Sequence, residues 1–206
     1  MKKKTSLKNK NKQELQTICE ELSFPSFHGE QIYRWMFNKN CDDIHSMHNI
    51  PKKLLLKISE LYTFNNLTIK NKSMSKIDET TKYLFETYDK NYIESVSMIE
   101  DNRHTICLSS QIGCSVDCDF CATGKMGIIR NLSVGEILDQ IIIIKKESKI
   151  PISNIVFMGM GEPFLNYSNV IKSCKILCDN SGFNFGHKRI TISTSGTFQV
   201  LQQIKL

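Results

Sequence analysis

The 206-residue chain lacks a long apolar run, and its most apolar stretch, residues 141–144, ends in two lysines. A helix that crosses a bilayer needs about 20 apolar residues, so the sequence predicts no membrane span and no membrane partner. The first residues, MKKKTSLKNKNK, have no apolar core and no small-residue cleavage site after them, and therefore do not form a signal peptide. We expect a cytoplasmic protein, in which cysteines stay reduced.

Internal repeats and low-complexity tracts are also absent, apart from the lysine-rich start. The formal net charge is +6. A positive charge of this size fits an anionic partner such as RNA, and it fits a compositional bias toward lysine and asparagine equally well. Eight cysteines then need an explanation. Disulfide frameworks are rare in a reducing compartment, so a cluster of cysteines there indicates a metal site or catalysis.

The first part of the chain has the apolar spacing of helices. QELQTICEEL (13–22), HGEQIYRWMF (28–37) and PKKLLLKISELY (51–62) each place apolar residues one helical turn apart. The sequence thus predicts a small helical domain over residues 1–65. Residues 66–100 are predicted to form a β-hairpin linker, because two runs rich in aromatic and β-branched residues flank the turn residues 89–91.

Strands and helices alternate from residue 101 onward. HTICLSS (104–110), NIVFMGMGEP (154–163) and KRITISTSG (188–196) are predicted strands, each followed by a loop and a predicted helix. Ser133 and Glu136 have the spacing of a capping box at the start of the first of these helices. The alternation implies parallel strands with right-handed crossovers. Three such units do not close a barrel, so the predicted fold is α/β, with residues 101–206 forming the first half of a (β/α) barrel.

Three cysteines at the spacing C-x3-C-x2-C lie in SSQIGCSVDCDFCATGKMG (109–127): Cys114, Cys118 and Cys121. The same spacing would place them on one face of a helix, but the glycines at 113, 124 and 127 argue against a helix. A helix would also spread the first and third thiols over roughly 10 Å, too far for one compact site. A loop can wrap all three around one centre.

Zinc and an iron–sulfur cluster are the two candidates for that centre. A structural zinc site uses four ligands, usually as two pairs, and a fourth ligand here could come only from Cys107 or His104, at unusual spacings. Three thiolates on a four-iron, four-sulfur cluster leave one iron open, at which a substrate or cofactor can bind. The spacing favours the iron–sulfur cluster.

The cysteine spacing, with Phe120 directly before the last cysteine, resembles the motif of the radical S-adenosylmethionine (SAM) superfamily. The longer stretches CLSSQIGCSVDCDFCATGKMGIIRNLSVGEI, GMGEP and ITISTSG are similar to the RlmN/Cfr family of RNA methyltransferases. The resemblance covers nearly all of the chain. It implies a radical SAM barrel, a 4Fe-4S cluster on Cys114, Cys118 and Cys121, and SAM bound at the open iron.

The same resemblance assigns roles to further residues. Gly161 and Glu162, at the end of a predicted strand, and Ser193, at the end of the next, match SAM contacts. Glu94 matches the residue that accepts the proton of the substrate ring. Cys107 matches the cysteine that forms a transient disulfide with a second, C-terminal cysteine to release the product. Without the resemblance, each would be interpreted as an ordinary turn, strand or core residue.

The resemblance implies methylation of adenine C2 in 23S rRNA, and in tRNA, through a methyl-cysteine intermediate. C8 methylation, as in Cfr, and a non-catalytic iron–sulfur RNA-binding module are the alternatives. The implied partners are RNA and an electron donor such as flavodoxin or ferredoxin, and the protein is expected to be a monomer. The methyl-carrying cysteine belongs to the C-terminal half of the barrel, so we expect the chain to be truncated and its methylation activity to belong to a full-length parent.

Overall fold

The computed structural model describes residues 4–101 and 103–196. These residues form two compact units, which we describe separately. The first unit contains residues 4–66 and 175–185, and the second contains residues 67–101, 103–174 and 186–196. The predicted helix over residues 197–206 lies outside the described residues. None of the helices in the described residues is long and apolar enough to cross a membrane.

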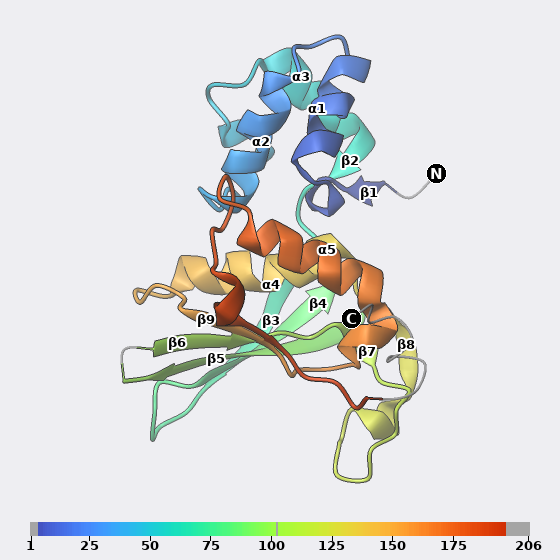
Figure 1. Ribbon diagram of the computed structural model, residues 1–206, viewed down its shortest axis with the longest axis vertical. Helices are drawn as coiled ribbons and strands as arrows, with labels where there is room; N and C mark the ends of the chain where they lie inside the picture. The colour runs from blue at the N-terminus through green and yellow to red at the C-terminus, as the bar shows by residue number, and fades with distance from the viewer. Residues whose placement is uncertain (1–3, 102, 197–206) are drawn as a thin grey trace. The chain divides into compact units, whose positions relative to one another are not determined.

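The first unit is built from three helices, each close to its predicted position (Figure 1): α1 Lys12–Glu21, α2 Phe27–Phe37 and α3 Lys52–Leu61. A two-residue parallel pair, β1 Thr5–Ser6 with β2 Tyr62–Thr63, joins the two ends of this segment. The helices bury the apolar residues that their period predicts, including Leu15, Ile32 and Leu54. Gly29 permits the close packing of α1 against α2, because a Cβ there would lie 2.4 Å from the backbone nitrogen of Gln16.

The second unit is built on a six-stranded sheet with the order β10-β9-β6-β5-β4-β3. The predicted hairpin is confirmed as β4 Thr81–Thr87 paired with β5 Tyr92–Glu100, and β3 Leu67–Met74 adds an antiparallel strand that the sequence did not predict. β6 Arg103–Cys107 is antiparallel to β5 and parallel to β9 Asn154–Phe157, which is parallel to β10 Ile190–Ile192. The predicted parallel strands are therefore confirmed.

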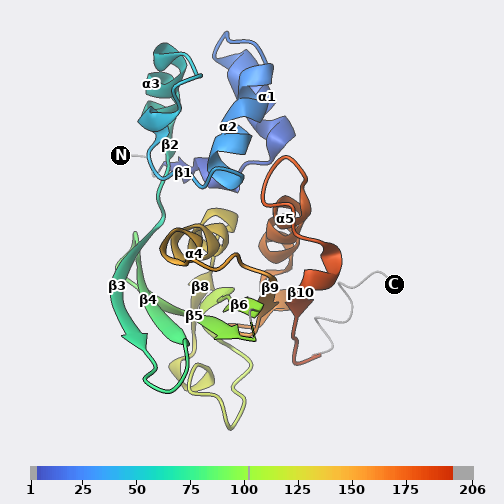
Figure 2. The same cartoon turned by 90° about the vertical axis from the view of Figure 1, so that its left-hand side faces the viewer.

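Helices follow the first two parallel strands of this sheet. α4 Val134–Glu147 connects β6 to β9, and α5 Tyr167–Cys178, which passes into the first unit after Cys174, connects β9 to β10. The capping box at the start of α4 is present as predicted, with Ser133 and Glu136 bonded to each other's backbone nitrogens. α4 lies on one face of the sheet (Figure 2). The fold is thus part of an α/β barrel, and the described residues do not close it.

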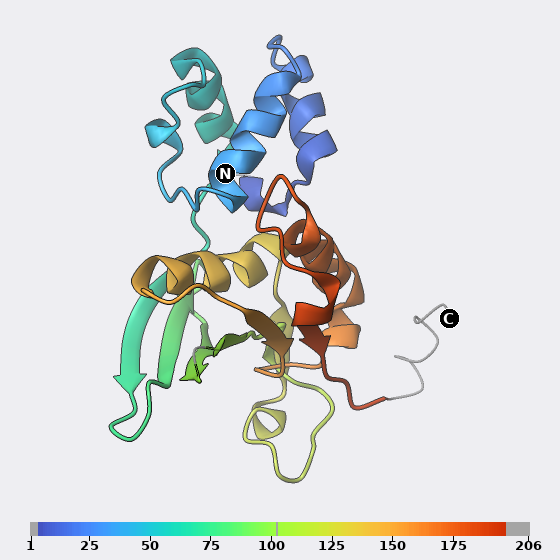
Figure 3. The ribbon, with the colours of Figure 1, turned by 60° about the vertical axis from the view of Figure 1, so that its left-hand side comes forward.

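A short antiparallel ribbon flanks the cysteine loop. β7 Gln111–Gly113 pairs with β8 Ile128–Asn131, and the residues between them form the loop that projects beyond the sheet (Figure 3). No α-helix occurs between residues 114 and 127, where the only regular element is the 3-10 turn Gly124–Met126. The prediction of a loop rather than a helix is confirmed.

Candidate metal and cofactor site

One pocket of about 370 Å³ collects most of the predicted site residues. It is lined by the three loop cysteines, Phe120, the turn after β9 and the segment after β10. All three predicted cluster ligands and all three predicted SAM contacts are among its lining residues: Cys114, Cys118, Cys121, Gly161, Glu162 and Ser193. Residues as far apart in sequence as Cys114 and Ser193 therefore face one space at the carboxyl ends of the parallel strands, where parallel α/β folds bind ligands.

Backbone hydrogen bonds close the cysteine loop. The Cys114 N–H donates to the Gly127 carbonyl at 3.0 Å, which joins the two ends of the loop. Gly113 makes this closure possible, because its φ is +75° and a Cβ there would lie 1.8 Å from the Gly127 oxygen. Within the loop, the Cys121 N–H donates to the Cys118 carbonyl at 2.9 Å. These bonds explain why glycines flank the cysteines.

The donor set of three thiols is of the kind that iron–sulfur clusters use. All three are free and half-buried. Hydrogen bonds from the Gly124 N–H, and then from Thr123, lower the pKa of Cys121 below its ordinary value, which favours the thiolate that a metal needs. Nowhere in residues 4–101 and 103–196 do three Cys, His, Asp or Glu side chains converge on a point that could hold one ion. A four-iron cluster needs no such convergence, because each thiolate binds a different iron.

The turn after β9 is shaped by two close backbone approaches. Gly161 has a φ of +97°, and a Cβ there would lie 2.5 Å from the Cβ of Gln111. Gly159 is equally constrained, because its Cβ would lie 2.7 Å from the Leu108 carbonyl oxygen. The GMGEP sequence thus brings the turn against the segment before the cysteine loop, an approach that a side chain at either glycine would prevent.

Glu162 is buried and organises the rim of the pocket. Its Oε1 accepts a hydrogen bond from the Phe164 N–H at 3.0 Å, and its Oε2 accepts one from the Ser195 N–H at 2.8 Å. A carboxylate has about four acceptor positions, and the hydrogen bonds within the described residues occupy two of them. Ser193 lies at the end of β10, where its N–H reaches the Phe157 carbonyl at 3.4 Å. The sequence did not predict that Glu162 also caps the following turn.

Glu94 and Cys107 do not line this pocket; they lie on the sheet face opposite α4. Val96, Cys107 and Val156 are register partners across β5, β6 and β9 and therefore share a face. Glu94 precedes Val96 by two residues and lies on the same face. Its Oε1 forms an ion pair with the Lys82 Nζ at 3.0 Å. The structure thus brings the two predicted catalytic residues together on adjacent strands.

Cys107 is half-buried, and burial raises the pKa of its thiol, an effect that a hydrogen bond from Met158 N–H partly offsets. The thiol is therefore protonated at neutral pH. All eight cysteines lie within the described residues and are free there, so the structure contains no disulfide at Cys107.

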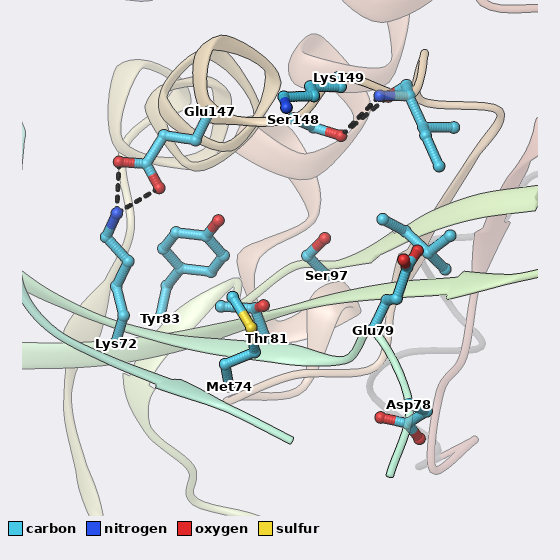
Figure 4. Close-up of a pocket in the computed structure, with 12 residues that line it drawn as sticks. Lys72, Met74, Asp78, Glu79, Thr81, Tyr83, Ser97, Glu147, Ser148 and Lys149 are labelled. Atoms are coloured by element: carbon cyan, nitrogen blue, oxygen red, sulfur yellow. Dashed lines mark hydrogen bonds and ion pairs between the residues drawn. The ribbon is translucent and has the colours of Figure 1, made fainter. Parts of the chain in front are cut away.

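A larger hollow of about 980 Å³ lies between β3, β4, β5 and the end of α4 (Figure 4). None of its lining residues lines the cysteine pocket. The Lys72 Nζ contacts both Glu147 oxygens at 2.6 Å. Burial, and then the Glu147 carboxylate, raise the pKa of Tyr83 to about 12. We assign the site to the smaller pocket, because the predicted cluster ligands and SAM contacts line that pocket and none of them lines this hollow.

Sequence reasoning missed the polar residues that support the site. Ser109, Gln111, Gln140 and Asn166 are all buried and hydrogen-bonded between the strands and the two loops. Arg130 binds both the hairpin carboxylate of Asp89 and the buried carboxylate of Glu136. The only signals of these residues in the sequence were polar residues within apolar segments, such as SSQ after a predicted strand and the glutamine in EILDQII.

The fold and the pocket define the class: the chain carries a radical SAM domain. The model of the radical SAM superfamily matches residues 108–205. The model of the ribosomal RNA large subunit methyltransferase N-terminal domain matches residues 5–63. With both domains present in this order, the chain belongs to the RlmN family of radical SAM proteins. Membership implies a 4Fe-4S cluster and SAM as cofactors, and the pocket residues fit both.

Individual relatives agree with this assignment. Proteins of Pseudothermotoga lettingae and Thermotoga maritima, each named "Probable dual-specificity RNA methyltransferase RlmN", are 44% and 45% identical to the chain over 90% and 89% of its length. A crystal structure of a radical SAM methyltransferase from Sphaerobacter thermophilus matches 93% of the chain with a TM-score of 0.88 and 37% identity, and the match covers 57% of that structure. The chain covers 54% of each of the two curated relatives, so it spans about half of their length.

Proposed function

We propose that the whole protein transfers a methyl group from SAM to C2 of an adenine in RNA, with 23S rRNA and tRNA as substrates. The observation that carries this proposal is the pocket that the three loop cysteines share with Gly161, Glu162 and Ser193. Family membership and the names of the relatives support it.

The pocket residues would bind both cofactors. Cys114, Cys118 and Cys121 would hold three irons of the cluster and leave the fourth for SAM. When bound, the cluster supplies the electron that cleaves SAM to a radical. Glu162 would accept hydrogen bonds from the amino group of SAM, Gly161 leaves room for the ligand against the backbone, and Ser193 contacts SAM from the next strand.

Radical chemistry suits the proposed substrate atom. Adenine C2 is electron-poor and is not a nucleophile, so it does not attack the methyl group of SAM directly. In the proposed reaction a cysteine of the whole protein, outside this chain, first carries the methyl group. Glu94 then takes the ring proton on the sheet face opposite α4, where its carboxylate pairs with Lys82. Cys107 would free the product by forming a disulfide with the methyl-carrying cysteine: its thiol loses a proton, the S–S bond forms as the bond between the other sulfur and the transferred carbon breaks, and the odd electron would return to the cluster.

The proposal extends to partners and location. RNA agrees with the formal charge of +6. A one-electron reductant, flavodoxin or ferredoxin, must reduce the cluster. We propose that the protein is a cytoplasmic monomer.

SAM cleavage by the chain itself is the first test. The anaerobically reconstituted and reduced chain should release 5′-deoxyadenosine from SAM. Cys118→Ala should abolish this release, because one cluster ligand is lost, whereas Cys174→Ala, a half-buried cysteine of α5, should preserve it. Absence of 5′-deoxyadenosine from a chain that carries the cluster would contradict the proposed SAM chemistry.

Analysis of RNA nucleosides after reaction with the whole protein identifies the product. 2-Methyladenosine would support the proposal, and its loss in Glu94→Gln would support the role of Glu94. 8-Methyladenosine would replace the proposal with Cfr-like chemistry. RNA binding by a protein that carries the cluster but neither cleaves SAM nor methylates adenine would indicate the non-catalytic iron–sulfur module.

A further inference from the structure

The segment Leu108–Gln111, which joins β6 to the cysteine loop, is hydrogen-bonded to β9 and to the turn after it. The Leu108 N–H donates to the Val156 carbonyl at 2.8 Å, and the Gly159 N–H returns a bond to the Leu108 carbonyl at 3.0 Å. The N–H groups of Ser110 and Gln111 both reach the Met160 carbonyl, at 2.8 and 3.1 Å. The start of the cysteine loop and the predicted SAM-binding turn are therefore one backbone assembly.

Ser109 connects this assembly to the strand that carries Glu94. Its hydroxyl donates to the Glu94 carbonyl at 2.5 Å and accepts from the Met160 N–H at 2.9 Å. The register of β5 with β6 ends at the pair Val96–Cys107, and Glu94 would be the next partner of Ser109. The serine side chain thus replaces the missing backbone donor where the strands part. One fully buried hydroxyl spans the distance between Glu94 and the turn.

Gln140 of α4 fixes the backbone of Ser109. Its Nε2 donates to the Ser109 carbonyl at 3.0 Å, and its Oε1 accepts from the Ser109 N–H at 2.9 Å. The same Oε1 accepts from the Ser95 hydroxyl at 2.6 Å. Gln140 is fully buried, so these bonds are not exchanged for bonds to water. The direction of the Ser109 side chain is therefore determined by the helix behind it.

Gln111 completes the support of the turn from the same segment. Its Oε1 accepts from the Glu162 N–H at 2.8 Å, and its Nε2 donates to the Asn131 side chain at 2.7 Å. The two N–H groups on either side of Gly161 are thus held by Ser109 and Gln111.

We propose that Ser109 is a positioning residue that sets the spacing between the SAM-binding turn Met160–Glu162 and the proton acceptor Glu94. The catalytic meaning of that spacing rests on the proposed function, but the spacing itself belongs to the chain and can be measured without activity. Loss of the hydroxyl would free the turn from β5 while leaving the cysteine ligands in place.

Ser110 provides a matched control. It is the neighbouring residue, it is equally buried, and its hydroxyl makes only a marginal contact of 3.5 Å with the Met160 carbonyl. Ser109→Ala and Ser110→Ala delete the same atom from adjacent buried positions. A role limited to filling the core would give the two variants similar properties.

Hydrogen exchange of the Met160 amide in the reconstituted chain is the first measurement. We expect Ser109→Ala to accelerate it about tenfold, or ~1.4 kcal/mol, relative to wild type, and Ser110→Ala to change it less than about twofold. Equal rates in the two variants would overturn the proposal. If Ser109→Ala does not fold, Ser109→Cys keeps the volume with a weaker hydrogen-bonding group, and its Met160 amide should exchange faster than in wild type. An unchanged rate in that variant would also overturn the proposal.

The product ratio is the second measurement, made in the whole protein. Ser109→Ala should raise the ratio of 5′-deoxyadenosine to methylated adenine at least about tenfold, because a shifted proton acceptor slows methylation more than SAM cleavage. Ser110→Ala and Ser109→Thr, which retains the hydroxyl, should keep the wild-type ratio. An unchanged ratio in Ser109→Ala would overturn the proposal, whereas a wild-type protein that makes no methylated adenine would refute the proposed function and leave the exchange result valid.

Discussion

The two compact units bury different kinds of side chain. In the described part of the first unit the buried residues are almost all apolar, and the buried polar ones are Ser6, Lys8 and His28. The second unit buries a long series of hydrogen-bonded polar groups around the strand ends, among them Ser109, Gln140 and Glu162. Apolar packing can hold helices together with many combinations of side chains. Buried hydrogen bonds fix particular atoms, and a site that places two cofactors against a substrate needs that accuracy.

The largest effect should come from the apolar core of the first unit. Leu54→Ala removes a fully buried side chain of α3 and should lower the free energy of unfolding by about 3 kcal/mol. Leu56→Ala, on the exposed face of the same helix, should cost less than about 0.5 kcal/mol. Urea titration of both variants measures the difference. Similar costs would mean that α3 does not pack as described.

Removing one arginine from each unit compares the contribution of a buried ion pair to stability with that of an exposed one. Arg130→Ala leaves the buried Glu136 carboxylate without its cation and should cost about 2 kcal/mol, a value reduced because Arg130 itself is partly exposed. Arg34→Ala removes an exposed pair with Glu30 within α2 and should cost no more than about 0.5 kcal/mol. Urea titration of both arginine variants measures the two costs in free energy of unfolding. An Arg130 variant as stable as the Arg34 variant would show that the buried ion pair contributes little.

The smallest effect is expected from the titration of two cysteines. The pKa of Cys121 in the cysteine loop should differ from that of Cys19 in the core of the first unit. Burial, and then Glu20, raise the pKa of Cys19 to about 11, whereas the Gly124 N–H lowers that of Cys121. Alkylation of the cluster-free chain should therefore reach half its maximal rate below pH 9 at Cys121 and above it at Cys19. Because the folded state holds the Cys19 proton more tightly, stability should be lost as pH rises from about 9 to 11. The reverse order of midpoints would contradict the described environments.

The sequence predicted the elements that depend on local patterns. The helix period located α1, α2 and α3, and the capping box at Ser133 located the start of α4. β3 was missed because most of its residues are exposed and polar, so it has no alternating pattern and is identified only by its pairing with β4. The ribbon of β7 and β8 was missed for a different reason, because its strands are short and pair across the cysteine loop.

The sequence predicted those site residues whose side chains have a recognisable chemical role. Cysteine spacing alone indicated a cluster, and the resemblance supplied Glu94, Cys107 and the SAM contacts, whose roles stay predictions. Ser109 and Gln140 could not be found in this way, because a serine and a glutamine have no chemical signature until their partners are known. Their importance follows from which carbonyl and N–H groups the folded chain leaves without backbone partners.

Electron paramagnetic resonance of the anaerobically reconstituted, reduced chain tests the central claim most directly. The account predicts a 4Fe-4S spectrum that changes when SAM is added, because SAM binds the iron that Cys114, Cys118 and Cys121 leave open. A chain that takes up zinc instead of iron, or a cluster spectrum that SAM does not alter, would contradict it.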